Sequence, residues 1–174
     1  TSISVLTGIA FDGSQFVASS VTGSFFGSSS GTNWFNTSGT TQTLTGPLRD
    51  LIYTNETFLV VNDMQVATST DGRSWTNRSS ITNFGDGDYL ESVVYGNGRY
   101  VAGSYYRAIF TSTDGLTWTR PVLELPNSPN WGAVSGLAYG NGVFVGVVNN
   151  SYGEILTSAD GLAWTSPLLN TNRT

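Results

Sequence analysis

Carboxylates are the side chains in this sequence best suited to acid–base chemistry, because the chain offers no imidazole, thiol or lysine amine. It contains no His and no Cys, and all 7 basic residues are Arg. This composition excludes Ser-His and Cys-His catalysis, lysine Schiff bases, imidazole or thiolate zinc sites and the lysine of a phosphate-binding loop. What remains is a carboxylate pair of the kind that glycosidases use. The candidates are Asp63, Asp86, Asp88, Glu91 and Glu124.

Three of these acids lie close together in the segment Phe84-Gly-Asp-Gly-Asp-Tyr-Leu-Glu91. Asp86, Asp88 and Glu91 would offer the carboxylate oxygens that Ca²⁺ prefers. Their spacing is not that of an EF-hand loop, however, and neighbouring Gly and Asp residues are also typical of a solvated turn. We therefore expect a solvated turn, no metal and no cofactor, with Ca²⁺ binding as the alternative.

Aromatic, amide and basic side chains form three further clusters, at Tyr105-Tyr106-Arg107, Asn130-Trp131 and 149–152. Aromatic rings offer stacking area, and neighbouring amides supply hydrogen bonds, so such clusters suit recognition of sugars or proteins. We expect these clusters to bind a glycan or an extracellular protein surface, through Tyr105, Tyr106, Arg107, Asn130, Trp131 and Tyr152. The alternative is that these side chains only pack inside the fold.

The elements that would position these clusters come from an internal repeat. Four segments align: Ser28-Ser-Ser-Gly-Thr-Asn-Trp34, Ser69-Thr-Asp-Gly-Arg-Ser-Trp75, Ser112-Thr-Asp-Gly-Leu-Thr-Trp118 and Ser158-Ala-Asp-Gly-Leu-Ala-Trp164. A second pattern precedes each of them, as in Val93-Val-Tyr-Gly-Asn-Gly-Arg-Tyr-Val-Ala. Since both patterns keep the same order four times, we divide a single domain, 1–174, into repeats at about 6–47, 48–88, 89–132 and 133–174.

Each repeat is expected to form four short strands. In the third repeat these are about 91–95, 99–103, 108–112 and a strand around Trp118, because Gly96-Asn97-Gly98 and Asp114-Gly115 are turn signals. No segment of useful length shows the 3.6-residue apolar period of a helix. A repeated antiparallel unit of four strands is typical of a propeller blade. The sequence therefore predicts an all-β fold, a β-propeller of four four-stranded antiparallel blades that is either four-bladed or half of a larger ring.

The repeated Ser-x-Asp-Gly-x-x-Trp, with a Gly-Asn-Gly hairpin before it, resembles the Asp-box (BNR-like) repeats of β-propellers over about 6–165. That family includes sialidases, photosystem assembly factors and secreted carbohydrate-active or surface proteins. The usual Asp box has one more residue between Asp and Gly, so this is a shortened variant. The resemblance implies that Asp71, Asp114 and Asp160 hold turns, with Ser30 as a weaker substitute in the first repeat. It also implies that four tryptophans pack between blades, namely Trp34, Trp75, Trp118 and Trp164.

The resemblance also makes sialidase activity a test case, since that chemistry needs three converging arginines. Arg73 and Arg99 fall in or beside turns on one face, opposite the expected ligand face, which consists of the second-to-third-strand loops and the connections between blades. Nothing in the sequence makes Arg49, Arg107 and Arg120 converge. We therefore expect a non-catalytic binding or surface-interaction module. The alternatives are a structural subunit of a glycosylated extracellular assembly or filament, and a carbohydrate-active hydrolase.

Charge and composition narrow the partners and the compartment. The net charge of −5 argues against nucleic acid and anionic membranes, and no apolar run approaches the ~18 residues of a membrane span. The lack of Cys and Lys and the wealth of Ser, Thr and Asn suit a secreted protein, and the absence of an initiating Met suits a processed chain. The expected glycosylation sites are the N-x-S/T sequons at Asn36, Asn55, Asn77, Asn149 and Asn172.

Four blades are few for a closed ring, so self-association is a further expectation. The chain either closes alone, or pairs with a second copy into an eight-bladed ring, or stays an open arc that polymerises head to tail. The sequence leaves these three outcomes open.

Overall fold

The computed structural model describes residues 5–38, 44, 46–78, 80–81, 88–106, 108–121, 132–150 and 153–166. It confirms the all-β propeller, with four antiparallel sheets that follow one another along the chain. Blade 1 comprises β1 (Leu6–Phe11), β2 (Phe16–Ser20), β3 (Phe25–Ser28) and β4 (Phe35–Asn36). Blade 2 comprises β5 (Leu48–Thr54), β6 (Thr57–Asn62), β7 (Val66–Ser69) and β8 (Thr76–Asn77).

The other two blades contain three full strands each. Blade 3 comprises β10 (Leu90–Gly96), β11 (Arg99–Ser104) and β12 (Ile109–Ser112), and blade 4 comprises β14 (Ala133–Gly140), β15 (Val143–Asn149) and β16 (Glu154–Ser158). Their fourth strand is reduced to the single bridges Thr111–Thr119 and Thr157–Thr165. A short strand β13 (Thr117–Trp118) also pairs in parallel with β9 (Ser80–Ile81), which lies in the connection from blade 2.

The shorter fourth strands have a reason in the sequence. In blades 1 and 2 the residue three positions after the repeat tryptophan donates its backbone N–H across the sheet, from Thr37 to Phe25 O (2.9 Å) and from Arg78 to Val66 O (2.7 Å). The same sequence position holds Pro121 in blade 3 and Pro167 in blade 4. Proline has no N–H to donate, so the ladder cannot continue there.

Tight hairpins join the first two strands of each blade. In blades 2, 3 and 4 the hairpin residues have positive φ: 49° and 58° at Asn55 and Glu56, 47° and 71° at Asn97 and Gly98, and 51° and 79° at Asn141 and Gly142. These angles are those of the two-residue turns that match strand twist. The hairpins therefore fix the register of the inner strands.

The core lies between the blades, in three clusters of buried side chains. Blades 1 and 2 meet around Val17, Phe25 and Trp75, blades 2 and 3 around Leu59 and Trp118, and blades 3 and 4 around Val101 and Trp164. Two polar contacts, one buried and one partly buried, tie the inner strands together: Ser92 donates to Val134 O (2.8 Å), and Asp50 accepts from Val93 N (2.9 Å). Each blade is therefore stabilised chiefly by its neighbour.

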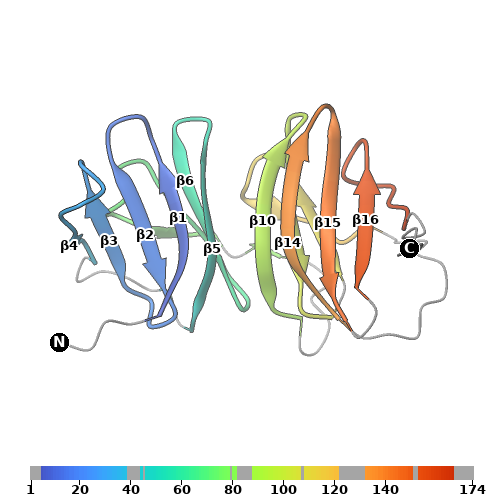
Figure 1. The fold of residues 1–174 in the computed structure, drawn as a ribbon, viewed down its shortest axis with the longest axis horizontal. Helices are drawn as coiled ribbons and strands as arrows, with labels where there is room; N and C mark the ends of the chain where they lie inside the picture. The colour runs from blue at the N-terminus through green and yellow to red at the C-terminus, as the bar shows by residue number, and fades with distance from the viewer. Residues whose placement is uncertain are drawn as a thin grey trace, which may run out of the picture.

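The four blades form an open arc. β1 packs on β5, β5 on β10 and β10 on β14, and among the described residues no comparable packing joins β14 back to β1. Blade 1 (blue) and blade 4 (orange to red) lie at opposite ends of the longest axis (Figure 1). The described part of the chain has no helix that could span a membrane.

Candidate functional site

The Ser-x-Asp-Gly turns between the last two strands share one hydrogen-bond pattern. In blade 2, Asp71 Oδ1 accepts from the backbone N–H groups of Arg73 (2.8 Å) and Ser74 (2.7 Å), and Ser69 Oγ accepts from Gly72 N (2.8 Å). Asp114 and Asp160 do the same in blades 3 and 4, at 2.8 to 2.9 Å. The glycine after each Asp has a positive φ, 67° at Gly72, which explains its presence.

These turns change the acidity of their aspartates. Partial burial would raise the pKa of Asp71, but the N–H groups of Ser74 and Arg73 and the Ser69 hydroxyl outweigh it and lower the pKa to about 2. The N–H groups of Thr117 and Leu116 lower the pKa of Asp114, and those of Ala163 and Leu162 lower the pKa of Asp160. The aspartates are thus ionised turn anchors within separate blades and not members of one acidic centre.

Blade 1 uses Ser30 in place of the aspartate. Ser30 Oγ faces the same two N–H groups at longer distances, 3.3 Å to Thr32 N and 3.4 Å to Asn33 N. A neutral hydroxyl at these distances holds the turn less firmly than a carboxylate does.

The repeat tryptophans differ in burial. Trp75, Trp118 and Trp164 are 9%, 0% and 4% exposed, and each packs against the preceding blade. Trp34 is 37% exposed, so its expected position between blades is corrected. The reason lies in the packing, because blade 1 meets blade 2 through its other face, which carries Val17 and Phe25.

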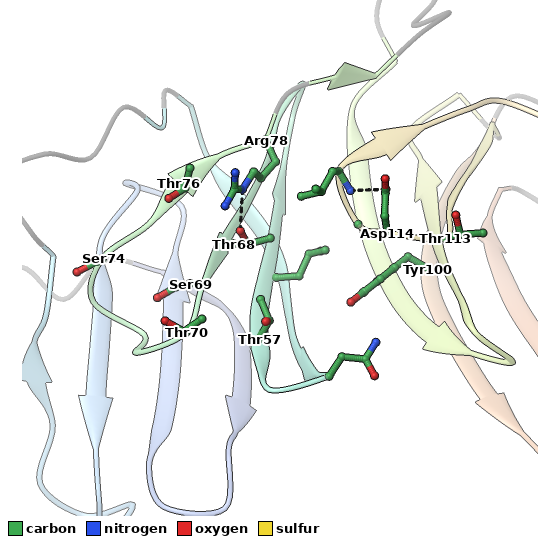
Figure 2. Close-up of a pocket in the computed structure, with 14 residues that line it drawn as sticks. Thr57, Thr68, Ser69, Thr70, Ser74, Thr76, Arg78, Tyr100, Thr113 and Asp114 are labelled. Carbon is green, nitrogen blue, oxygen red and sulfur yellow. Dashed lines mark hydrogen bonds between the residues drawn. The ribbon is translucent and has the colours of Figure 1, made fainter.

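A hydroxyl-lined groove of about 580 Å³ lies between blades 2 and 3 (Figure 2). One wall is the outer part of blade 2, with Thr68, Thr76 and Arg78, and the other is the turn of blade 3, with Asp114 and Leu116. Arg78 Nε donates to Thr68 Oγ1 (3.1 Å), which holds the guanidinium at the groove. The remaining lining residues are Asn55, Thr57, Leu59, Ser69, Thr70, Ser74, Tyr100, Thr113 and Gly115.

A second groove of about 580 Å³ lies one blade earlier, between blades 1 and 2. It is lined by the corresponding elements: the hairpin residue Gln15, the strand β3, the segment 35–38 and Arg73 in the turn of blade 2. The repeat therefore produces two similar polar grooves on the outer side of the arc. Hydroxyls, an amide and an arginine beside short apolar patches are suited to hydrogen bonding with polyhydroxylated ligands.

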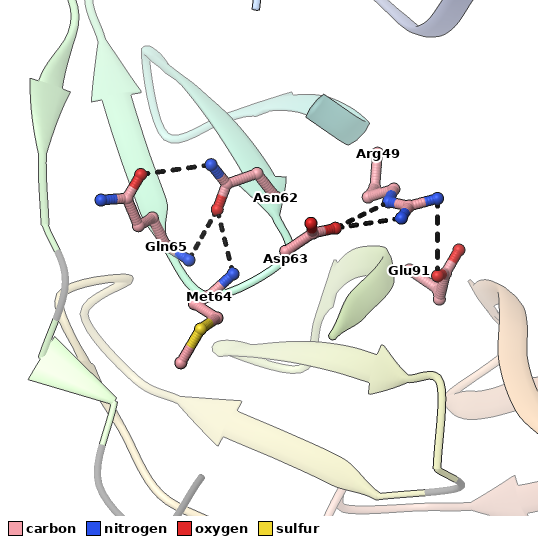
Figure 3. A network of polar contacts seen from close by, with 6 residues as sticks. All are labelled: Arg49, Asn62, Asp63, Met64, Gln65 and Glu91. Carbon is pink, nitrogen blue, oxygen red and sulfur yellow. Dashed lines mark hydrogen bonds and ion pairs between the residues drawn. The ribbon is translucent and has the colours of Figure 1, made fainter. Parts of the chain in front are cut away.

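On the other side of blades 2 and 3, one arginine holds two of the candidate acids (Figure 3). Arg49 Nε donates to Asp63 Oδ1 (3.0 Å), and its Nη1 lies 3.7 Å from Glu91 Oε1. Burial raises the pKa of Glu91, Arg49 opposes this, and Asp63 adds to it. Asp63 lies in the loop between β6 and β7. Asn62 closes this loop, because its Oδ1 accepts from Gln65 N (2.7 Å).

A separate arginine holds Asp88. The Asp88 side chain is 3% exposed and accepts from Arg120 Nη1 at 3.0 Å. Among the described residues, no group of three acidic, His or Cys side chains could hold a metal ion. Asp86 and Glu124 lie outside the described residues.

The predicted aromatic surface is described only in part. Tyr105 and Tyr106 are half-exposed and meet edge to face, with ring centroids 5.1 Å apart, and Tyr89 lies 6.5 Å from Tyr105. Arg107, Asn130, Trp131 and Tyr152 lie outside the described residues. Tyr89 was missed by sequence reasoning because it precedes its strand by one residue and shares no motif with the other two.

The sequons fall mostly on exposed positions. Asn36, Asn55 and Asn149 are exposed, Asn77 is half-buried and Asn172 lies outside the described residues. Asn36 and Asn77 occupy the same position in the outermost strands β4 and β8. Asn55 lines one groove and Asn36 lines the other.

The structure resembles solved propeller structures at low sequence identity. The designed protein Ika4 is 13% identical, with a TM-score of 0.62 over 91% of this chain and 92% of its own. YCF48 from Cyanidioschyzon merolae is 15% identical, with a TM-score of 0.72 over 98% of this chain and 58% of its own. A chain of the nidogen–laminin complex is 15% identical, with a TM-score of 0.68 over 91% of this chain and 62% of its own.

These similarities establish the fold alone. No protein-family model and no curated protein matches the sequence. The chain spans less than two thirds of YCF48 and of the nidogen–laminin chain, whereas it spans nearly all of Ika4.

Proposed function

We propose that this chain is a secreted, non-catalytic binding module whose grooves between neighbouring blades take glycans. The observation that carries the proposal is the repeated groove, built twice from the same elements and lined by hydroxyl, amide and arginine side chains. Such a surface exchanges hydrogen bonds with sugar hydroxyls, and the exposed Leu116 offers a small apolar patch for sugar C–H groups. The four Ser-x-Asp-Gly-type turns support placing the chain among Asp-box propellers.

We propose binding rather than hydrolysis because the described candidate acids are already paired with arginines. Asp63 and Glu91 share Arg49, and Asp88 is paired with Arg120. Each of these carboxylates already has an arginine partner at 3.0 to 3.7 Å, whereas a glycosidase needs two carboxyl groups that are free to reach the two sides of the scissile bond.

The test is a glycan screen followed by calorimetric titration of the best oligosaccharide. Thr68→Val removes one groove hydroxyl at nearly constant shape. Thr157→Val is the matched control, because Thr157 pairs with Val145 as Thr68 pairs with Leu59 but lines neither groove. Loss of one hydrogen bond of ~1 kcal/mol should weaken binding about fivefold in Thr68→Val and leave Thr157→Val unchanged. No saturable glycan binding, or equal affinity of both variants and wild type, contradicts the proposal.

A second candidate function is that of a structural subunit in an extracellular assembly. The observation that favours it is the apolar surface left open on both terminal blades.

A further inference from the structure

The junction between neighbouring blades is built the same way three times inside the chain. The glycine of each Ser-x-Asp-Gly turn packs on a branched side chain of the preceding blade, so closely that an added Cβ would lie 2.5 Å from Val17 at Gly72, 3.2 Å from Leu59 at Gly115 and 2.9 Å from Val101 at Gly161. Val17, Leu59 and Val101 are all buried. The turn after the third strand of blade n+1 therefore fits the second strand of blade n in the same way at each junction.

Polar contacts follow the same rule at two of these junctions. A hairpin amide of one blade donates to a backbone carbonyl in the next blade's turn. Gln15 Nε2 lies 3.0 Å from Asp71 O, and Asn97 Nδ2 lies 3.5 Å from Ala159 O.

Blade 1 carries the turn side of this junction, and among the described residues no other blade packs on it. The three atoms nearest to a Cβ added at Gly31 all belong to Phe16 of the same blade, at 3.5 to 4.0 Å, and Trp34 is 37% exposed. Ile9 and Phe11, on the same outer side of β1, are 60% and 48% exposed. An apolar groove of about 460 Å³, lined by Leu6, Ile9 and Trp34 among others, runs along this side.

Blade 4 carries the other side of the junction, a second-strand face of the kind on which the turn glycines pack. Val145 is the counterpart of Val17, Leu59 and Val101, and it is half-exposed between Val143 and Val147, which are 37% and 47% exposed. The hairpin residue Asn141 is the counterpart of Asn97. The exposed faces thus lie at the two ends of the arc, far apart in one chain (Figure 1).

We infer that the outer face of blade 4 is a docking surface for the blade 1 end of a second copy of this chain. The contact repeats the junction already present three times: Gly31 of one copy packs on Val145 of the next, Trp34 covers its β15, and Asn141 donates to the carbonyl of Ser29 or Ser30. The interface joins two different surfaces, so it produces a ring where the rotation closes and a filament where it does not. It does not depend on glycan binding at the grooves, and either can fail alone.

The test uses two variants that each block one end. Ile9→Asp places a charge on the blade 1 face and Val147→Asp places one on the blade 4 face, both at exposed positions, while Met64→Asp is the control at an exposed loop position away from both ends. Mass is measured by sedimentation up to about 100 μM, because subunit contacts of ordinary size reach micromolar Kd. Far-ultraviolet circular dichroism and thermal melting confirm that each variant is folded.

Wild type and Met64→Asp should exceed the 18.5 kDa of one chain, and each end variant alone should remain a monomer. An equimolar mixture of the two end variants should form a dimer, because one intact face of each remains complementary. Three results overturn the inference: a wild type that stays monomeric, an end variant that still associates alone, or a mixture of folded end variants that stays monomeric.

Discussion

Trp75 lies flat on Phe25, with ring centroids 4.0 Å apart and an interplanar angle of 13°. This stack joins blade 2 to blade 1. It also sets Trp75 apart, because its buried Nε1 has no hydrogen-bond partner among the described residues, whereas Trp118, Trp164 and Trp34 donate Nε1–H to the glycine carbonyl of their own turn at 3.1 to 3.2 Å.

The contrast predicts different costs for tryptophan removal. Trp75→Ala should lower the free energy of unfolding by about 3–5 kcal/mol, since it empties a buried site between blades. Trp34→Ala, the matched change at the open end, should cost about 1 kcal/mol in the monomer because Trp34 is partly exposed. Urea unfolding monitored by circular dichroism measures both free energies of unfolding. Equal losses of stability would contradict the finding that Trp34 lies at an uncovered face of blade 1.

A milder substitution, tryptophan to phenylalanine, separates the contribution of the aromatic stack to stability from that of the indole hydrogen bond. Trp75→Phe retains an aromatic ring on Phe25 and removes an unsatisfied buried N–H, so its cost should stay near 1 kcal/mol. Trp118→Phe loses the bond to Gly115 O together with buried area, and should cost about 2–3 kcal/mol. A larger loss for Trp75→Phe than for Trp118→Phe in the same unfolding assay would refute this account.

The turn of blade 1 should become more stable when an aspartate replaces Ser30. Ser30→Asp places a carboxylate opposite the N–H groups of Thr32 and Asn33, as in the other three blades, and should stabilise the protein by about 0.5–1 kcal/mol. The reverse change, Asp71→Ser, should destabilise it by about 1 kcal/mol. Thermal melts of both variants at neutral pH check the pair, and destabilisation by Ser30→Asp would show that the turns are not equivalent.

The same turns predict loss of stability in acid. A carboxyl whose pKa is lower in the folded than in the unfolded chain contributes stability that is complete above the unfolded pKa, about 3.9 for Asp, and is lost as the pH falls through the folded pKa. For Asp71 that window runs from about 3.9 down to about 2. Unfolding measured from pH 6 to pH 2 should show a steeper decline for wild type than for a variant with Asn at positions 71, 114 and 160, and parallel curves would argue against these anchors.

The ion pair between Asp88 and Arg120 should contribute to the stability of the protein. Arg120→Ala leaves a carboxylate of 3% exposure without its ion partner and should cost about 2 kcal/mol, less than for a fully buried pair because Arg120 is partly exposed. The double variant with Asp88→Asn should recover part of the loss. A double-mutant cycle in urea measures the coupling, and additive effects would show that the pair contributes nothing.

The strands and hairpins were open to prediction because their signals are local. The expected strands at 91–95 and 99–103 are observed as Leu90–Gly96 and Arg99–Ser104, set by the Asn97-Gly98 hairpin between them. Local turn chemistry explains this success. The shortened fourth strands were not predicted, since we expected four strands in every blade, although Pro121 and Pro167 in the sequence are consistent with them.

The site and the open arc could not be predicted in the same way. The groove brings Thr68 and Arg78 opposite Leu116, which belongs to another repeat, and blade packing decides that distance. From the sequence we expected the ligand on the opposite face, which stays a prediction, and Arg78 was not among the expected binding residues. The burial of Trp34 was also overestimated, since its motif aligns with the other three apart from Ser30, and its place at the end of the arc leaves it partly exposed.

The central claim is that one chain forms an open arc whose two ends fit each other between copies. Since the chain has no Cys, a variant with cysteines at Ser29 and Asn141 can be cross-linked cleanly by a short bis-maleimide, and cysteines at Asn97 and Ala159 provide the control at an internal junction. The control should link within one chain, and the end-to-end variant should yield covalent dimers or a ladder on a denaturing gel. Linkage of positions 29 and 141 within a single chain, or none where the control links, would contradict the account.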